Sequence, residues 1–378
     1  MTKKLNEMLS RIPEEMELDI KKYNLSEQEM LSKWTARFLS LNNEYRDDRN
    51  ESNFQELLSE TVKEVVTPNE TSNLFSCVPT GFADLDRIIG GLPLGELIIL
   101  GARPAMGKSA FMVSIMINSI LNKNSPIAFF SLENSAQYML LRMLSNIADC
   151  SYHHLVSKKL EEYQLQEISR KSAILETANL TIEDTFFSLD DIISRTDFLV
   201  REKGIQLIII DYLQLIRTRS RRENREMEIA TICRELKRMA RKYNVAVFVS
   251  SQLSRAVETR GGDKRPVLSD LRESGAIEQD ADKVFFLHRP EYYNITEDGE
   301  GNSTLGIADI IIAKNRSGPL DTVRLRFTAK SASFKDYEET FFSGIEGEFF
   351  KDMRKNEFNT DLKNRGSKSN DIEEDHPF

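Results

Sequence analysis

The stretch "LIILGARPAMGKSAFMVS", residues 97–114, carries most of the information about the fold. A run of apolar residues leads into a turn that contains a glycine, and the turn leads into a segment with helical periodicity. Such a turn binds phosphate, because its backbone N–H groups and the helix N-terminus face the anion. We therefore predict a nucleotide site. Its expected contact residues are Arg103, Pro104, Ala105, Met106, Gly107, Lys108, Ser109 and Ala110.

The loop reads A-x-x-x-x-G-K-S from Ala102 to Ser109, whereas the usual pattern starts with glycine, and Gly101 stands one residue earlier. We expect Lys108 to reach the β- and γ-phosphates of ATP and the Ser109 hydroxyl to ligate Mg²⁺. The alternative is an ordinary helix-capping turn. The strand pattern before the turn and the helix pattern after it favour a phosphate loop.

Apolar, β-rich runs recur along the chain, at 97–101, 126–131, 205–210, 245–250, 283–287 and 307–312. Helical patterns separate the earlier runs. This alternation predicts an α/β fold with a mostly parallel central sheet flanked by helices. The shorter spacing within 305–345 predicts antiparallel strands added at one edge.

Polar residues stand at or just after the ends of three of these runs, namely Glu133, Asp211 and Gln252. Ligands in open α/β sheets bind beyond the carboxyl ends of the strands. Asp211 suits a carboxylate on the Mg²⁺ side, Glu133 a general base or water-positioning group, and Gln252 a hydrogen-bonding sensor of the γ-phosphate. The alternative is that the carboxylates cap helices, above all Glu133, which precedes "NSAQYMLLRML". Together with the loop they predict an ATPase site.

Several long blocks resemble the motor domain of DnaB-type replicative DNA helicases, and the resemblance covers roughly residues 76–345. They include "VPTGFADLDRIIGGLPLGELIILGARPAMGKSAF", "LIIIDYLQLI", "SSQLSRAVETRGGDKRPVLSDLRESGAIEQDADKVFFLHR" and "IIIAKNRSGPLDTVRLRF". The resemblance implies a RecA-like fold and a hexameric ring that uses ATP to move along single-stranded DNA. It also implies a catalytic role for Glu133, a metal-side role for Asp211 and a sensor role for Gln252.

In "AKNRSG", Lys314 and Arg316 match the basic pair that a neighbouring subunit of the family inserts into the ATP site. A K-x-R at the end of an edge strand places both charges on one face of that strand. An arginine acting from the next subunit would make hydrolysis depend on assembly. A pair of solvated surface cations is the alternative.

The segment "RESGAIEQDAD", residues 272–282, matches the loop that holds DNA in the family. Its candidate DNA contacts are Arg272, Glu273 and Gly275. Arginine pairs with phosphate and glycine permits close backbone approach, so binding would be independent of base sequence. We expect residues 254–266 to form a mobile companion loop. For the basic run at 217–225, a solvated loop and DNA contact both stay open.

The expected organisation is a helical N-terminal segment (1–66), a linker (67–75), the motor domain (76–350) and a disordered acidic tail (351–378). A helix at about 53–66 resembles the family's linker helix, which docks on the adjacent subunit. Complete members of the family carry a globular N-terminal domain, so we expect a shortened N-terminal region here. That leaves the usual loader and primase contacts in doubt.

The composition limits the classes of function. The net charge of −9 gives no general attraction to nucleic acid, so DNA contact requires local basic patches. Cys77, Cys150 and Cys233 have no metal-ligand spacing, and we expect them to be reduced and buried, as in a cytoplasmic protein. An apolar run of about 18 residues, the length of a membrane span, is absent from the sequence.

The last residues, "SNDIEEDHPF" (369–378), resemble the acidic tail of bacterial single-stranded-DNA-binding proteins. The resemblance implies a docking peptide for a replication or repair protein, with Phe378 in a pocket and the acids steering the encounter. An ordinary solvating tail is the alternative.

Two other functions stay open on sequence grounds. One is a RecA-like translocase or recombinase that hydrolyses ATP on single-stranded DNA without separating strands. The other is a loader or assembly protein for which ATP is only a switch, although such a switch does not need Glu133, Gln252 and Arg316 together.

Overall fold

The computed structural model describes residues 30, 33–35, 54–66, 76–218, 225–271 and 274–337. The chain divides into two units, Met1–Ser76 and Cys77–Phe378. In the first unit, helix α3 (Phe54–Val66) occupies the segment expected to be helical. Its described apolar side chains Phe54, Leu58, Val62 and Val66 are exposed and spaced four residues apart, so they form one stripe along the helix.

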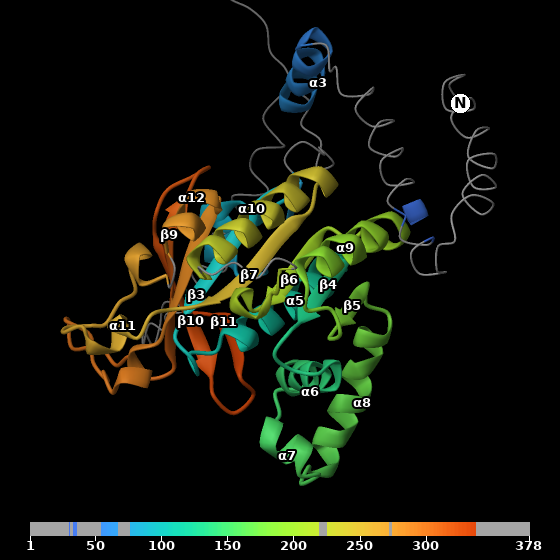
Figure 1. The fold of residues 1–378 in the computed structure, drawn as a ribbon. Helices are drawn as coiled ribbons and strands as arrows, with labels where there is room; N and C mark the ends of the chain where they lie inside the picture. The colour runs from blue at the N-terminus through green and yellow to red at the C-terminus, as the bar shows by residue number, and fades with distance from the viewer. Residues whose placement is uncertain are drawn as a thin grey trace, which may run out of the picture. The chain divides into compact units, whose positions relative to one another are not determined.

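The second unit is built on a nine-stranded sheet in the order β11-β10-β9-β8-β3-β7-β6-β4-β5 (Figure 1). The strands are β3 (Leu97–Ala102), β4 (Ile127–Ser131), β5 (Leu180–Glu183), β6 (Leu207–Asp211), β7 (Ala246–Gln252), β8 (Lys283–His288), β9 (Ile307–Asn315), β10 (Thr322–Thr328) and β11 (Ser333–Asp336). A separate pair joins β1 (Cys77–Val78) to β2 (Leu92–Pro93).

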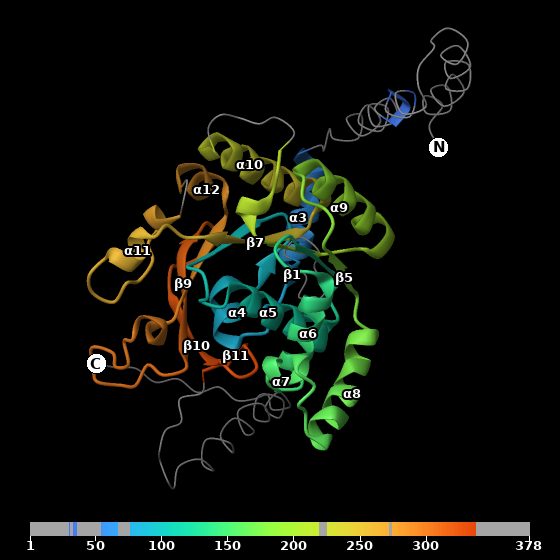
Figure 2. The ribbon, with the colours of Figure 1, turned by 60° about the horizontal axis from the view of Figure 1, so that its bottom comes forward.

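Helices connect the strands and cover both faces of the sheet (Figures 1 and 2). They are α4 (Ala83–Ile89), α5 (Lys108–Lys123), α6 (Ala136–Ile147), α7 (Tyr152–Val156), α8 (Glu162–Glu176), α9 (Leu189–Lys203), α10 (Arg225–Tyr243), α11 (Ala256–Thr259) and α12 (Ser274–Asp280).

The predicted mostly parallel sheet is confirmed. Strands β8, β3, β7, β6, β4 and β5 run parallel, and β9, β10 and β11 add antiparallel strands at one edge. The sequence prediction did not include β5. One placement was wrong: β9, which carries Lys314, is not an edge strand, because it pairs with both β8 and β10.

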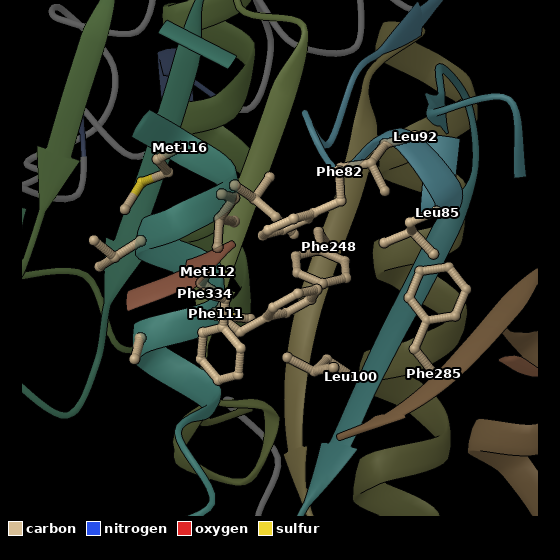
Figure 3. Close-up of a cluster of buried hydrophobic side chains, with 14 of the residues drawn as sticks. Phe82, Leu85, Leu92, Leu100, Phe111, Met112, Met116, Phe248, Phe285 and Phe334 are labelled. Carbon is tan, nitrogen blue, oxygen red and sulfur yellow. The ribbon is translucent and has the colours of Figure 1, made fainter. Parts of the chain in front are cut away.

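Alternation along β3 divides the core into two layers. Ile98 and Leu100 belong to a cluster with residues of α4, α5 and α6, whereas Leu97 and Ile99 belong to a cluster with residues of α9, α10 and α12. Figure 3 shows the first layer, in which Phe111 of α5 stacks on Phe82 with ring centroids 5.4 Å apart. With apolar contacts on both faces, the sheet holds its strand ends firmly in register.

The register sets the position of the candidate site. Ala102 at the end of β3 lies opposite Gln252 at the end of β7, and Asp211 at the end of β6 lies opposite Ser131 at the end of β4. The polar residues that end these strands therefore lie at one edge of the sheet. We call it the carboxyl edge.

Candidate nucleotide-binding and hydrolysis site

The segment between β3 and α5 forms a loop that faces a cavity of about 460 Å³. Ala105 and Gly107 have positive φ angles of 63° and 101°. A Cβ on Gly107 would lie 3.2 Å from the Phe334 ring, so both the backbone and the space favour glycine there. The cavity is lined by Pro104, Ala105, Gly107, Lys108, Ser109, Ala110, Glu133, Asn134, Tyr138, Arg142, Tyr212, Gln252, Phe327 and Ala332.

Lys108 opens α5 and lines this cavity. Its ammonium group makes a hydrogen bond of 3.4 Å to the Ala102 carbonyl. Burial lowers the pKa of Lys108, while the nearby carboxylates of Asp211 and Glu133 act in the opposite direction. A half-buried cation with one long hydrogen bond to the described residues is suited to gain an anionic partner such as phosphate.

Asp211 is buried at the end of β6 and accepts two hydroxyl hydrogen bonds. Ser109 donates to its Oδ2 at 2.5 Å, and Ser250 donates to its Oδ1 at 2.6 Å. A hydroxyl beside a carboxylate, next to a phosphate loop, supplies the hard oxygen ligands that Mg²⁺ prefers. The residues present therefore fit a Mg²⁺ ion, with Ser109 and Asp211 as the protein ligands.

Glu133 is exposed in the cavity, two residues beyond β4. The helix-capping alternative does not hold, because Ser135 caps α6 by accepting from Tyr138 N, and Asp184 accepts from Ala136 N at 2.8 Å. Among the described residues, Glu133 has no hydrogen-bond or ion-pair partner. Its carboxylate remains available to a ligand or to water.

Gln252 ends β7 and also lines the cavity. Its backbone N–H donates to Gln214 Oε1 at 3.2 Å, and Gln214 in turn donates to Ser251 Oγ at 3.0 Å. Sequence reasoning missed Gln214, because its partners lie about 38 residues further along the chain. Gln214 fixes the strand end that presents Gln252.

Aromatic residues line another part of the cavity, and sequence reasoning missed them too. Phe327 of β10 lines it, and the Arg289 guanidinium lies 3.7 Å from the centroid of the Phe327 ring. Tyr138 and Arg142 come from α6 and are joined by a hydrogen bond of 2.7 Å. The pKa of Tyr212 is raised by burial and by the nearby Glu133 and Asp211. A flat apolar ring beside a phosphate loop suits a nucleotide base.

Two predicted contact residues of the loop turn away from the cavity. Met106 is buried in the core. The Arg103 side chain is only 7% exposed and forms an ion pair with Glu258. Neither residue lines the cavity, so the geometry leaves only their backbone groups to the predicted nucleotide contact.

Lys314 and Arg316 lie away from the cavity, at the end of the sheet where the parallel strands begin. We call this end the opposite edge. Lys314 donates to the carbonyls of Glu278 and Ala281, and Arg316 donates to that of Gln279. Burial and the neighbouring Arg316 lower the pKa of Lys314. Both cations therefore rest on the carboxyl-terminal end of α12, where helix carbonyls attract positive charge.

The distance from these cations to the phosphate loop follows from β3. Arg316 Nη1 lies 3.7 Å from Asp282 Oδ1, and Asp282 Oδ2 accepts from the N–H of Leu97, the first residue of β3. The phosphate loop follows the last residue, Ala102. At about 3.3 Å per residue, β3 separates the two ends by roughly 17 Å. The basic pair does not reach the site of its own chain.

The predicted DNA contacts are only partly covered. Arg272 and Glu273 lie outside the described residues, and Gly275 is exposed on α12. The expected mobility of residues 254–266 stays a prediction. Within this segment Arg260 forms an ion pair with Asp270, and Arg265 donates to the buried Asp309 at 2.8 Å. The acidic tail also lies outside the described residues.

Two smaller expectations concern cysteines and membranes. Cys150 and Cys233 are buried and free as predicted, whereas Cys77 is only half-buried. Within the described ranges, every helix is too short or too polar to cross a membrane.

A parallel sheet of this order, with a phosphate loop after β3 and polar residues at the neighbouring strand ends, defines the class of RecA-like P-loop proteins. The comparisons narrow the class. The sequence model of the family "DnaB-like helicase C terminal domain" matches residues 77–336. The chain belongs to this family.

Individual relatives agree with this assignment. The replicative DNA helicase DnaB of Geobacillus stearothermophilus is 40% identical over 291 residues, which is 76% of this chain and 63% of that protein. A solved ATPase domain is similar with a TM-score of 0.69 and 33% identity, covering 76% of this chain and 100% of that one. A DnaB-like replicative helicase, solved to show its interactions with primase, gives a TM-score of 0.65 at 30% identity, covering 82% and 78%. The chain thus matches somewhat less than two thirds of the length of its curated relative.

Proposed function

We propose that this protein is an ATP-driven DNA helicase that assembles as a ring, moves along single-stranded DNA and separates duplex strands. The observation that carries the proposal is one cavity in which Lys108, Glu133 and Gln252 meet beside the Ser109–Asp211 pair. Family membership supports strand separation over the translocase and switch alternatives. An assembly switch also has no use for a carboxylate such as that of Glu133, which has no partner in the described part of the chain.

In this proposal the backbone of the phosphate loop and Lys108 bind the triphosphate of ATP. Ser109 and Asp211 would hold Mg²⁺, which would neutralise charge on the phosphates. Phe327 packs on the base, with Arg289 against its ring. Glu133 orients the attacking water and accepts its proton, and Gln252 hydrogen-bonds the γ-phosphate.

The charge on the transferred phosphate needs a further cation, and this chain places Lys314 and Arg316 about one strand length away. We propose that a neighbouring copy supplies them across an interface, as the family resemblance implies. A closed ring, hexameric in this proposal, gives each site such a neighbour. The exposed stripe of α3 would dock on the adjacent subunit.

The DNA contacts are proposed for Arg272, Glu273 and Gly275, which bind the sugar-phosphate backbone without reading bases. The division into segments at about 66, 76 and 350 stays a prediction. So does the docking of a replication or repair protein on the tail that ends at Phe378. The relative solved with primase shows that contact for itself, and here primase stays a candidate partner.

The test is unwinding of a forked DNA by the full chain with ATP and Mg²⁺. Each arm is blocked in turn to give the direction of travel. Wild-type protein should separate the strands. Lys108→Ala should not, and Lys159→Ala, which removes an exposed lysine of the second unit, should behave as wild type. DNA-stimulated ATP hydrolysis without strand separation would mean that the protein is a translocase or recombinase rather than a helicase.

A further inference from the structure

The Arg103 side chain joins the phosphate loop to a distant segment. Its Nε and Nη2 both contact Glu258 Oε1, at 2.8 and 2.7 Å, and its Nη1 donates to the Leu253 carbonyl at 2.8 Å. In addition, Leu253 N donates to the Ala102 carbonyl at 3.2 Å. The first two residues of the loop are therefore tied to the residues after β7, Ala102 by its backbone and Arg103 by its side chain.

The segment that begins at Leu253 ends at Leu271, beside its own first residue. Leu253 forms an isolated antiparallel bridge with Leu271, and Ser254 N donates to the Asp270 carbonyl at 2.8 Å. Arg260 clamps Asp270 from within the segment. Leu271 immediately precedes Arg272, the first proposed DNA contact. Two steps, the hydrogen bond from Arg103 to Leu253 and the bridge from Leu253 to Leu271, thus connect the phosphate loop with the residue that precedes the proposed DNA segment.

Glu258 lies on α11 and joins this helix to the connection through its ion pair with Arg103. The helix has four residues, of which Val257 is buried, so apolar packing holds it weakly. The Glu258 side chain is 38% exposed, whereas that of its partner Arg103 is 7% exposed. Loss of the carboxylate would leave the buried Arg103 charge with the neutral Leu253 carbonyl as its acceptor, so the side chain would hold its position less firmly. Because Arg103 does not line the cavity, this change would weaken the link between the loop and the residues after β7 without displacing the groups that face the nucleotide.

We propose that Glu258 is a positioning residue which, through Arg103, couples occupancy of the phosphate loop by nucleotide to binding of single-stranded DNA by the segment after Leu271. The inference rests on the proposed function. Coupling between two sites is reciprocal, so ATP strengthens DNA binding by the same factor by which DNA strengthens ATP binding. Glu258 itself touches neither ligand.

The experiment compares the full-length wild type with Glu258→Gln, which keeps the shape and removes the charge. Two quantities are measured: the ratio of ATP turnover with and without single-stranded DNA, and the ratio of the DNA Kd values with ADP and with a non-hydrolysable ATP analogue. In the variant, the Kd ratio should fall toward one from a wild-type value of about 5–150. Stimulation by DNA should fall with it, while turnover without DNA is kept. Glu258→Asp, which keeps the charge, should recover part of both ratios.

Glu235→Gln is the matched control, because it removes a carboxylate whose ion pair with Arg238 is exposed on α10. Wild-type ratios in Glu258→Gln would overturn the inference. Equal loss of all turnover, together with a lower Tm, would also overturn it, because it would show a purely structural role. If the wild type itself hydrolyses no ATP, the proposed function fails first, and this failure is visible without any variant.

Discussion

The carboxyl edge of the central sheet and the opposite edge, where the parallel strands begin, differ in how their charged side chains are paired. At the carboxyl edge, Glu133 has no partner among the described residues, and Lys108 has one long hydrogen bond. At the opposite edge, Lys283 is fully buried and is satisfied by Glu96 and Ser317, while Lys237 pairs with Asp282. Buried charges need partners, so the second edge is complete as folded and the first is prepared for a ligand.

Lys314 and Arg316 lie at the complete edge, yet backbone carbonyls hold them rather than a tight ion pair. An exchange of these carbonyls for phosphate oxygens would cost little, because both are hydrogen-bond acceptors. Under the proposed function, one chain carries a nearly complete site at one edge and the cations that this site lacks at the other. Two copies in contact would complete the site.

The largest effect is expected from Arg316→Ala. The loss of an arginine that stabilises the transferred phosphate lowers turnover by roughly 10³–10⁵. Because the arginine acts on the neighbouring site, a mixture of Arg316→Ala and Lys108→Ala should regain part of the ATP hydrolysis that each lacks alone. Steady-state hydrolysis measures both effects, with the exposed Arg170→Ala as control. Wild-type turnover in Arg316→Ala would mean that the cations at the opposite edge do not complete the site at the carboxyl edge.

Glu133→Gln tests the prepared edge directly. Removal of the group that accepts the proton of water should lower turnover by roughly 10²–10⁴. ATP binding should persist, because Lys108 and the loop remain. Turnover and the Kd of a fluorescent ATP analogue separate the two steps, and Glu162→Gln on α8 is an exposed control. Equal loss of binding would mean that Glu133 supports the loop rather than the chemistry.

The parts of this arrangement that depend on local pattern could be predicted. Strands such as Leu207–Asp211 are apolar on both faces, and the polar residue that ends each of them marks the carboxyl edge. The strand Leu180–Glu183 was missed because it is half-buried at the sheet edge and too short for its own signal. The partners of Arg103 and Arg265 could not be predicted from the sequence, because distant ion pairs set the conformations of these side chains. Arg103 and Glu258 are 155 residues apart in sequence.

The Lys283–Glu96 pair at the opposite edge predicts that substitutions of its two partners lower the free energy of unfolding by different amounts. Glu96→Gln would leave the Lys283 charge fully buried without its carboxylate, which costs about 3–5 kcal/mol of unfolding free energy. Lys283→Met should cost less, because Glu96 is 21% exposed and can be hydrated. Urea unfolding of both full-length variants measures the difference. Equal effects would mean that the pair acts through packing rather than charge.

The smallest effect is expected from the two ends of β8. Lys283 begins this strand bonded to Glu96 and Ser317, whereas His288 ends it buried, with Nδ1 unpartnered within the described residues. Burial lowers the pKa of His288 from 6.5 to about 4, helped by the nearby Arg265 and opposed by Asp309 and Asp263. Between these values the unfolded chain takes up a proton and the folded chain does not.

The contribution of His288 to stability is therefore unchanged above pH 6.5 and is lost as the pH falls from 6.5 toward 4. The total is about 3 kcal/mol. His288→Phe should flatten this part of the curve of unfolding free energy against pH, whereas the exposed His154→Gln should leave it unchanged. An equally steep fall in His288→Phe would assign the acid sensitivity to other groups. The difference between the two ends of β8, where Lys283 is paired and His288 is not fully paired, would then have no effect on stability in acid.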